Sequence, residues 1–240
     1  MTHSLNADSE RGELKMQPIA TLRTIQVGTP NRYMHRESEA SAARPWETSF
    51  VRAPSPDRRW LYITHLDGNA QADTKNHGKL NQAVLLYAAA HYPWWQCELG
   101  RPEIGPGGFA ENFTLDGITE ATAHIGDTYA IGDARIQVTG PRYPCYKIAR
   151  RWGIPGLNGL VAATGRTGWY CRVLEEGWIE PGLPLLLVAR PYPDFTIALV
   201  NDFGHGRNQD SATAEALAAC PLLPDFWQRL VVARPAGRES

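Results

Sequence analysis

The sequence predicts a mainly β protein with helices (α+β class), in which a β-barrel is followed by a small C-terminal helical bundle. Short apolar segments recur between Gly and Pro turns over residues 19–193, a pattern typical of a barrel rather than a doubly wound sheet. Residues 194–240 change to helical periodicity and predict a three-helix appendage. With 240 residues, of which 43% are hydrophobic and 20% charged, the chain can bury a sizeable core.

The N-terminal part of the chain contains a polar tail and several short strand candidates. Residues 1–18 lack a hydrophobic period, so we expect a mobile tail. Apolar and β-branched runs predict three strands, at residues 21–28, 49–53 and 60–66. Residues 29–45 are polar, charged and bounded by prolines, which indicates a long loop or an insertion. Apolar residues recur at helical spacing over residues 80–97, the strongest helix candidate in the chain.

The remaining elements follow from turn residues and apolar runs. Four more strands are predicted, at residues 128–131, 135–139, 167–174 and 185–189. A short helix is predicted at residues 157–164. The C-terminal appendage contains three predicted helices, at residues 195–203, 212–220 and 225–233.

Charge and cysteine content exclude several classes of function. The net charge of −1 gives no general attraction to nucleic acid or to an anionic membrane. No run of 18 apolar residues exists and the N-terminus lacks a signal core, so we expect neither a transmembrane helix nor secretion. Cys97, Cys145, Cys171 and Cys220 form no CxxC pair, which disfavours a disulfide framework and the usual zinc sites. We therefore predict reduced thiols and a cytoplasmic location.

One cysteine, Cys145, lies in a stretch suited to chemistry, PRYPCYK at residues 141–147. Two prolines stiffen the backbone around it, while Arg142 and Lys147 place positive charge near the thiol. Nearby cations favour the thiolate, which is both a nucleophile and a ligand for soft metals. Cys145 is therefore the main candidate for a functional residue, and an inert buried thiol is the alternative.

Polar residues on either side of the predicted helix are further candidates. Asp73, His77 and Gly78 lie just before residue 80, where the N–H groups of a helix N-terminus would attract an anion. A glycine-rich loop farther along the chain carries Glu111 and Asn112. These residue types also serve as caps and turn formers, so the residues alone leave both interpretations open.

Several motifs occur together with PRYPCYK. Upstream are LDGNAQA followed by Asp73, the His77-Gly78 pair, AVLLYAAAHYPWW and FAENFT; downstream are GWY and RVL within residues 168–174. Their sequence and order resemble the MOSC family, the molybdenum cofactor sulfurase C-terminal domain, and most closely its bacterial YiiM-like branch. The resemblance covers residues 21 to about 200. Asn69, Lys79 and Ala110 depart from it, because the branch usually has Asp, Gly and Gly there.

This resemblance implies a MOSC-type barrel that binds the molybdenum cofactor (molybdopterin) and acts as an oxidoreductase. The implied reaction reduces N-hydroxylated compounds, as in hydroxylaminopurine detoxification. Cys145 would be the molybdenum ligand and, with His77, a catalytic residue. The implied cofactor-binding residues are Arg142, Lys147, Glu111, Asn112, Gly78, Asp73 and Trp169. Electrons would come from a separate flavin or iron–sulfur protein, since the chain has no cysteine set for a cluster of its own. The C-terminal appendage is a candidate docking site for that donor.

Two other functions suit the same cysteine. Cys145 could carry a persulfide and pass its sulfur to a metal centre or cofactor, because thiolate chemistry supports that transfer equally well. The protein could also bind the cofactor without turnover, as a carrier.

Overall fold

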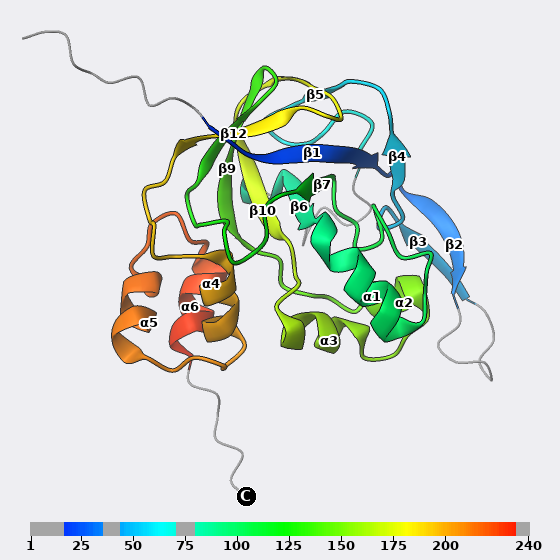
Figure 1. Ribbon diagram of the computed structural model, residues 1–240. Coiled ribbons are helices and arrows are strands. Elements are labelled where there is room, and N and C mark those ends of the chain that lie inside the picture. The colour runs from blue at the N-terminus through cyan, green and yellow to red at the C-terminus, as the bar shows by residue number, and fades with distance from the viewer. Residues whose placement is uncertain (1–16, 36–43, 71–79, 234–240) are drawn as a thin grey trace, which may run out of the picture.

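The computed structural model describes residues 17–35, 44–70 and 80–233, and at its centre is a closed β-barrel (Figure 1). Eight strands share one sheet, and β1 also pairs with β12, which closes the ring and leaves β4 (Ala53–Ser55) outside it. In pairing order the ring consists of β12 (Pro184–Ala189), β8 (Thr128–Ile131), β9 (Ala134–Pro141), β10 (Trp169–Glu175), β6 (Val84–Ala88), β7 (Phe113–Asp116) and β1 (Pro18–Val27). The predicted barrel is thereby confirmed.

The largest hydrophobic core belongs to the barrel. Leu22, Leu86, Phe113, Ile136 and Trp169 are fully buried members of one cluster to which the ring strands contribute. Alternate residues of a strand point to opposite faces, so each strand places every second side chain toward this core. Burying one Leu or Phe side chain stabilises a fold by about 1.5–3 kcal/mol. Because many such side chains are buried in the barrel, it is a stable scaffold for the loops at its ends.

Two small sheets extend from the barrel. β5 (Arg59–Leu61) pairs with β11 (Gly177–Ile179), and β2 (Asn31–His35) pairs with β3 (Arg44–Thr48). The second pair corrects the prediction of a loop over residues 29–45 in part, since β2 and the first two residues of β3 fall inside that range. Strands predicted at residues 49–53 and 60–66 are also shifted or shorter, as β4 and β5. Edge strands of three to five residues carry too few alternating positions to define their bounds by pattern.

The helices form two groups (Figure 1). Near β6 are α1 (Tyr92–Leu99), α2 (Lys147–Trp152) and α3 (Leu157–Thr164), with the 3₁₀ turns η1 (Leu80–Gln82) and η2 (Ala89–His91). The C-terminal group contains α4 (Ile197–Gly204), α5 (Ser211–Ala218) and α6 (Asp225–Val232). The predicted helix at residues 157–164 and the three C-terminal helices are confirmed. None of the helices in the described ranges has the length and apolarity needed to cross a membrane.

The helix predicted at residues 80–97 is wrong over most of its length. Val84–Ala88 is a barrel strand, and the α-helix begins only at Tyr92. Every residue of this strand is buried: Leu86 belongs to the barrel core, while Tyr87 packs in a second cluster with Trp95 and Phe109. A strand covered on both faces is an uninterrupted apolar run, which periodicity cannot distinguish from a buried helix.

Candidate functional site

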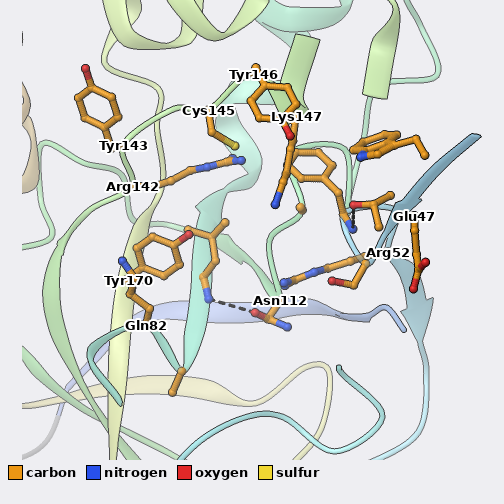
Figure 2. Close-up of a pocket in the computed structure, with 17 residues that line it drawn as sticks. Glu47, Arg52, Gln82, Asn112, Arg142, Tyr143, Cys145, Tyr146, Lys147 and Tyr170 are labelled. Carbon is orange, nitrogen blue, oxygen red and sulfur yellow. Dashed lines mark hydrogen bonds between the residues drawn. The ribbon is translucent and has the colours of Figure 1, made fainter. Parts of the chain in front are cut away.

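A pocket of about 280 Å³ opens beside the loop that joins β9 to α2 (Figure 2). Its wall is built from four segments and one strand residue: residues 46–52, 82–85, 110–112 and 142–147, and Tyr170. These segments are far apart in the sequence, and the closed barrel brings them together. Of the charged side chains in this described wall, three are cations, Arg52, Arg142 and Lys147, and one is an anion, Glu47. The pocket is therefore electropositive and suits an anionic ligand.

Cys145 lines this pocket and is partly exposed to it. It lies just before α2, and its carbonyl oxygen accepts a hydrogen bond from the Ile148 amide at 3.2 Å, which fixes the turn into the helix. Cys171 is buried in the barrel core, Cys220 is buried between α5 and α6, and Cys97 is exposed on α1. Of the four thiols, only Cys145 lies in the described wall of the pocket.

Arg142 is held tightly at the base of the same loop. Its side chain is buried, and Nη1 donates to the Phe109 carbonyl oxygen at 2.6 Å. Its main-chain N–H donates to the Gly168 carbonyl oxygen at 3.0 Å. The guanidinium also lies 5.5 Å from the centre of the Phe50 ring. These contacts hold a positive charge in place in the pocket wall next to Cys145.

Sequence reasoning missed Arg52, which reaches the pocket from the segment after β3. Its Nε and Nη1 atoms are buried and have no hydrogen-bond partner among the residues that the structure describes. Burial lowers the pKa of Arg52 to about 10, with a smaller lowering from Arg142, opposed by Tyr170 and Glu111. The group therefore still carries its charge at neutral pH. Burying a cation whose N–H groups lack hydrogen-bond partners costs free energy, unless a bound ligand supplies those partners.

Gln82 is a second residue that the sequence did not reveal. It ends η1 and lines the pocket, and its Oε1 atom is buried without a hydrogen-bond partner within the described chain. The pocket wall therefore contains a hydrogen-bond acceptor, Gln82 Oε1, and the Nε and Nη1 donors of Arg52, all without partners among the described residues. Tyr170 completes this wall, and burial raises the pKa of its phenol, which therefore stays neutral. Nothing in the local sequence around Arg52 or Gln82 distinguishes them from ordinary polar surface residues.

The predicted site residues Asn112 and Glu111 support the pocket through the backbone. Asn112 lines it, but its Oδ1 accepts from the Leu85 amide at 3.1 Å and its Nδ2 donates to the Gln26 carbonyl oxygen at 3.4 Å. Glu111 is fully buried behind the wall, where its carboxylate accepts from the amides of Gly107 and Phe109 and from the Tyr92 hydroxyl. Both side chains shape the loop whose Phe109 carbonyl holds Arg142.

Ala110, one of the departures from the family pattern, lines the pocket with a φ of 60°. This left-handed conformation costs a residue with a Cβ roughly 1–2 kcal/mol, which explains why glycine is usual at this position.

We expect Ala110→Gly to stabilise the protein by about 0.5–1 kcal/mol. The substitution relieves the backbone strain, but part of this gain is lost because glycine has more conformational freedom in the unfolded chain. The matched change Ala149→Gly in α2 should destabilise it by about 0.5–1 kcal/mol. Urea unfolding of both variants measures the two effects. Equal losses of stability would show that the strain at Ala110 is negligible.

The other predicted site residues have different placements. Lys147 lines the pocket at the first turn of α2. Trp169 is fully buried in the barrel core and does not line the pocket, whereas its neighbour Tyr170 does, because adjacent strand residues point to opposite faces. Asp73, His77, Gly78 and Lys79 lie outside the described residues. In the described chain no α-helix begins near residue 80, where η1 starts instead, so the predicted helix N-terminus there is wrong.

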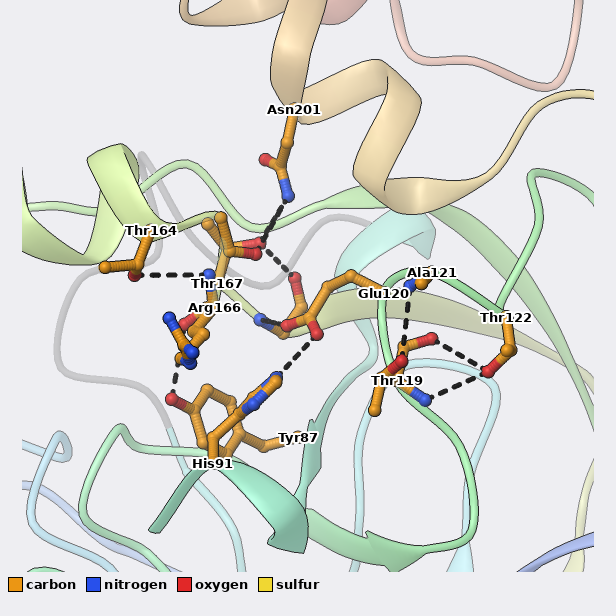
Figure 3. Close-up of polar contacts among 12 residues, drawn as sticks. Tyr87, His91, Thr119, Glu120, Ala121, Thr122, Thr164, Arg166, Thr167 and Asn201 are labelled. Carbon is orange, nitrogen blue, oxygen red and sulfur yellow. Dashed lines mark hydrogen bonds and ion pairs between the residues drawn. The ribbon is translucent and has the colours of Figure 1, made fainter. Parts of the chain in front are cut away.

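A buried polar network supports the far side of the site (Figure 3). Glu120 contacts His91 Nε2 at 2.6 Å and accepts a hydrogen bond from the Gly168 amide at 2.7 Å. On α4, Asn201 Nδ2 donates to Thr167 Oγ1 at 2.9 Å. Since the Gly168 carbonyl accepts the Arg142 amide, this network fixes the residues just before β10, to which the pocket loop is hydrogen-bonded.

Comparisons with known proteins agree with this architecture. A family model for the MOSC domain matches residues 73–185. The uncharacterized protein YflK of Bacillus subtilis is 35% identical over 182 residues, which cover 76% of this chain and 82% of YflK. A Gibberella moniliformis protein named reductase is 34% identical over 155 residues, which cover 63% of this chain and 27% of that protein.

Among solved structures, the crystal structure of YiiM from Geobacillus stearothermophilus is similar with a TM-score of 0.71 and 31% identity, covering 88% of this chain and 97% of that chain. This likeness agrees with the YiiM-like branch predicted from the motifs. Together with the family match and the extent of similarity to YflK, it shows that this chain belongs to the MOSC domain family.

Proposed function

We propose that this protein binds the molybdenum cofactor in the pocket beside Cys145 and reduces N-hydroxylated compounds there. The observation that carries the proposal is the buried guanidinium of Arg52, with two N–H-bearing nitrogens that lack partners among the described residues. The cofactor ends in a phosphate, an anion with several acceptor oxygens. Arg recognises phosphate through paired N–H groups, so such a ligand would supply the partners that Arg52 lacks.

The rest of the pocket fits the same group. Arg142 and Lys147 would balance further negative charge on the phosphate or the dithiolene, and Gln82 Oε1 would accept a hydrogen bond from an N–H on the pterin edge. The Cys145 thiolate is a soft ligand suited to molybdenum. When bound, the cofactor supplies a redox-active metal centre, while this chain contributes binding, orientation and charge.

The proposed reaction converts a hydroxylamino group to an amine. It consumes two electrons and two protons and releases water: R–NHOH + 2e⁻ + 2H⁺ → R–NH₂ + H₂O. A separate flavin or iron–sulfur protein would supply the electrons, and solvent at the open pocket would supply the protons. The similarity to a protein named reductase supports a redox role for the matched region.

The test begins with protein made in a host that synthesises the cofactor. We expect molybdenum and pterin close to one per chain, and reduction of a hydroxylaminopurine with reduced viologen as artificial donor. Molybdenum and pterin without turnover would indicate a carrier. Sulfane sulfur on Cys145 without molybdenum would indicate a sulfur carrier. If neither metal nor pterin is retained after isolation or reconstitution, the cofactor assignment is wrong.

A further inference from the structure

Tyr170 extends from β10 into the wall of the pocket. The residue is partly buried, and Figure 2 shows its hydroxyl group pointing into the pocket, on the side where Arg142 and Arg52 lie. Its main-chain carbonyl oxygen accepts a hydrogen bond from Thr139 Oγ1 at 3.1 Å, whereas its hydroxyl has no hydrogen-bond partner among the residues that the structure describes. The hydroxyl is therefore available to a bound molecule.

The fully buried tyrosines of the described chain differ from Tyr170 in this respect. Tyr92 and Tyr129 donate their hydroxyl protons to carboxylates, and Tyr87 donates to a main-chain carbonyl oxygen at 3.2 Å. Hydroxyl groups inside a protein nearly always have such a fixed partner, because burying them without one costs free energy. The hydroxyl of Tyr170 is thus set apart by its position at the cavity rather than in the core.

Two more tyrosines line the pocket, but their rings are directed differently. Tyr143 stacks on His205, which follows α4, with centroids 5.4 Å apart, and Phe226 of α6 meets the same ring edge-on at 5.3 Å. Figure 2 shows this ring turned away from Cys145. Tyr146 precedes α2 and is 60% exposed. Of the tyrosines in the described wall, Tyr170 is therefore the one best placed to reach a molecule inside the pocket.

The ionisable groups that face the Tyr170 phenol come from two other segments. Arg142 and Cys145 belong to the loop after β9, and Arg52 belongs to the segment after β3. Burial raises the pKa of Tyr170, while Arg142 and Arg52 oppose this rise and Cys145 adds a smaller one, so the phenol is protonated at neutral pH. The two guanidinium groups would stabilise a phenolate formed in passing. The other charged groups of the described wall are Lys147 and Glu47.

We propose that Tyr170 is a catalytic proton donor, which protonates the oxygen of a hydroxylamino substrate as its N–O bond breaks. This inference rests on the proposed function and names the source of one of the two protons that the reaction consumes. Two electrons from the separate donor protein enter the N–O bond, which breaks, and the oxygen takes the phenol proton and leaves as water. The nitrogen takes a proton from solvent and becomes the amine, and solvent returns a proton to the phenolate.

Tyr170→Phe tests this role, because it removes the hydroxyl and keeps the ring. No hydrogen bond within the described chain is lost, so the variant should match the wild type in thermal unfolding and in molybdenum and pterin content. It should also bind 2-aminopurine, the fluorescent product of 2-hydroxylaminopurine, with wild-type affinity. With 2-hydroxylaminopurine and reduced viologen, we expect kcat to fall by about 10²- to 10⁴-fold at unchanged KM, the usual contribution of a general acid.

The matched control is Tyr62→Phe. Tyr62 is 39% exposed and does not line the pocket, so the loss of its hydroxyl should leave kcat, KM and cofactor content unchanged.

Two further measurements separate a proton donor from a residue that only shapes the pocket. In Tyr170→Phe the proton must come from solvent, so the ratio of wild-type to variant kcat should increase as the pH rises, by up to about tenfold per unit. Hydroxylamine-O-sulfonate releases sulfate, which leaves without a proton. Both proteins should therefore reduce it at rates within about threefold of each other.

Several outcomes would overturn the inference. A ratio that does not change with pH, an equal loss of rate with hydroxylamine-O-sulfonate, or weaker 2-aminopurine binding would each contradict a proton-donor role. If Tyr170→Phe reduces 2-hydroxylaminopurine as fast as the wild type, the inference fails while the proposed function stands. If the wild type itself reduces neither substrate, the proposed function fails and the inference fails with it.

Discussion

Replacing Cys145 with Ser should remove molybdenum from the isolated protein almost completely. The hydroxyl of Ser is a hard, weakly acidic ligand, whereas molybdenum in this cofactor favours a soft thiolate. Because even outer partners of a metal site contribute about 10- to 100-fold to affinity, we expect retention and reductase activity to fall by about 100-fold or more. Elemental analysis after gel filtration measures retention, and the viologen-coupled assay measures activity.

The matched control for this change is Cys97→Ser. Cys97 is exposed on α1 and does not line the pocket, so its loss should leave metal content and activity unchanged. Both substitutions are nearly isosteric, and we expect unfolding free energies within about 0.5 kcal/mol of the wild type. Full metal content in the Cys145→Ser protein would exclude this thiol as the ligand, whatever the activity.

Replacing Arg52 with Leu should change binding and stability in opposite directions. Without the guanidinium, the cofactor loses its predicted phosphate partner, a charge-assisted contact of about 1.5–3 kcal/mol, so affinity should fall by about 10- to 100-fold. The ligand-free protein should be as stable as the wild type or more stable by about 1 kcal/mol, because two buried nitrogens that lack partners among the described residues disappear. Cofactor titration and urea unfolding of the ligand-free protein measure the two effects.

Two further variants sharpen this prediction. Arg52→Lys keeps the charge but not the paired donors, and should bind with intermediate affinity. Arg58→Leu removes an exposed guanidinium that lies 3.9 Å from the centre of the Trp178 ring, outside the pocket wall, and should leave affinity unchanged. A loss of stability in Arg52→Leu without any loss of affinity would mean that Arg52 is a structural residue.

The local sequence was a good guide wherever structure follows from nearby residues. The strand at Thr128–Ile131 and the helix at Leu157–Thr164 match their predicted bounds, because Gly and Pro turns delimit both segments. Proline and charge around Cys145 also identified the one thiol that lies in the described pocket wall. The family motifs extended this to a MOSC-type barrel, which the fold confirms.

Long-range contacts decided the rest of the site. Arg52 and Gln82 are chemically ordinary in the sequence, and only barrel closure brings them into the same pocket wall as Cys145, with polar atoms that are buried and lack hydrogen-bond partners among the described residues. Asn112 lines the pocket, and only the tertiary structure shows that its amide is also bonded to the main chain of β6 and β1.

The amino-acid sequence by itself therefore determined the fold class, most of the helices and strands, and the cysteine around which the pocket is built. Tertiary structure alone decided that β6 is a strand, that Tyr170 rather than Trp169 lines the pocket, and that the C-terminal helices hold Tyr143. The physical reason is that local backbone preference depends on neighbouring residues, whereas the burial and partners of a polar group depend on segments that are distant in the chain.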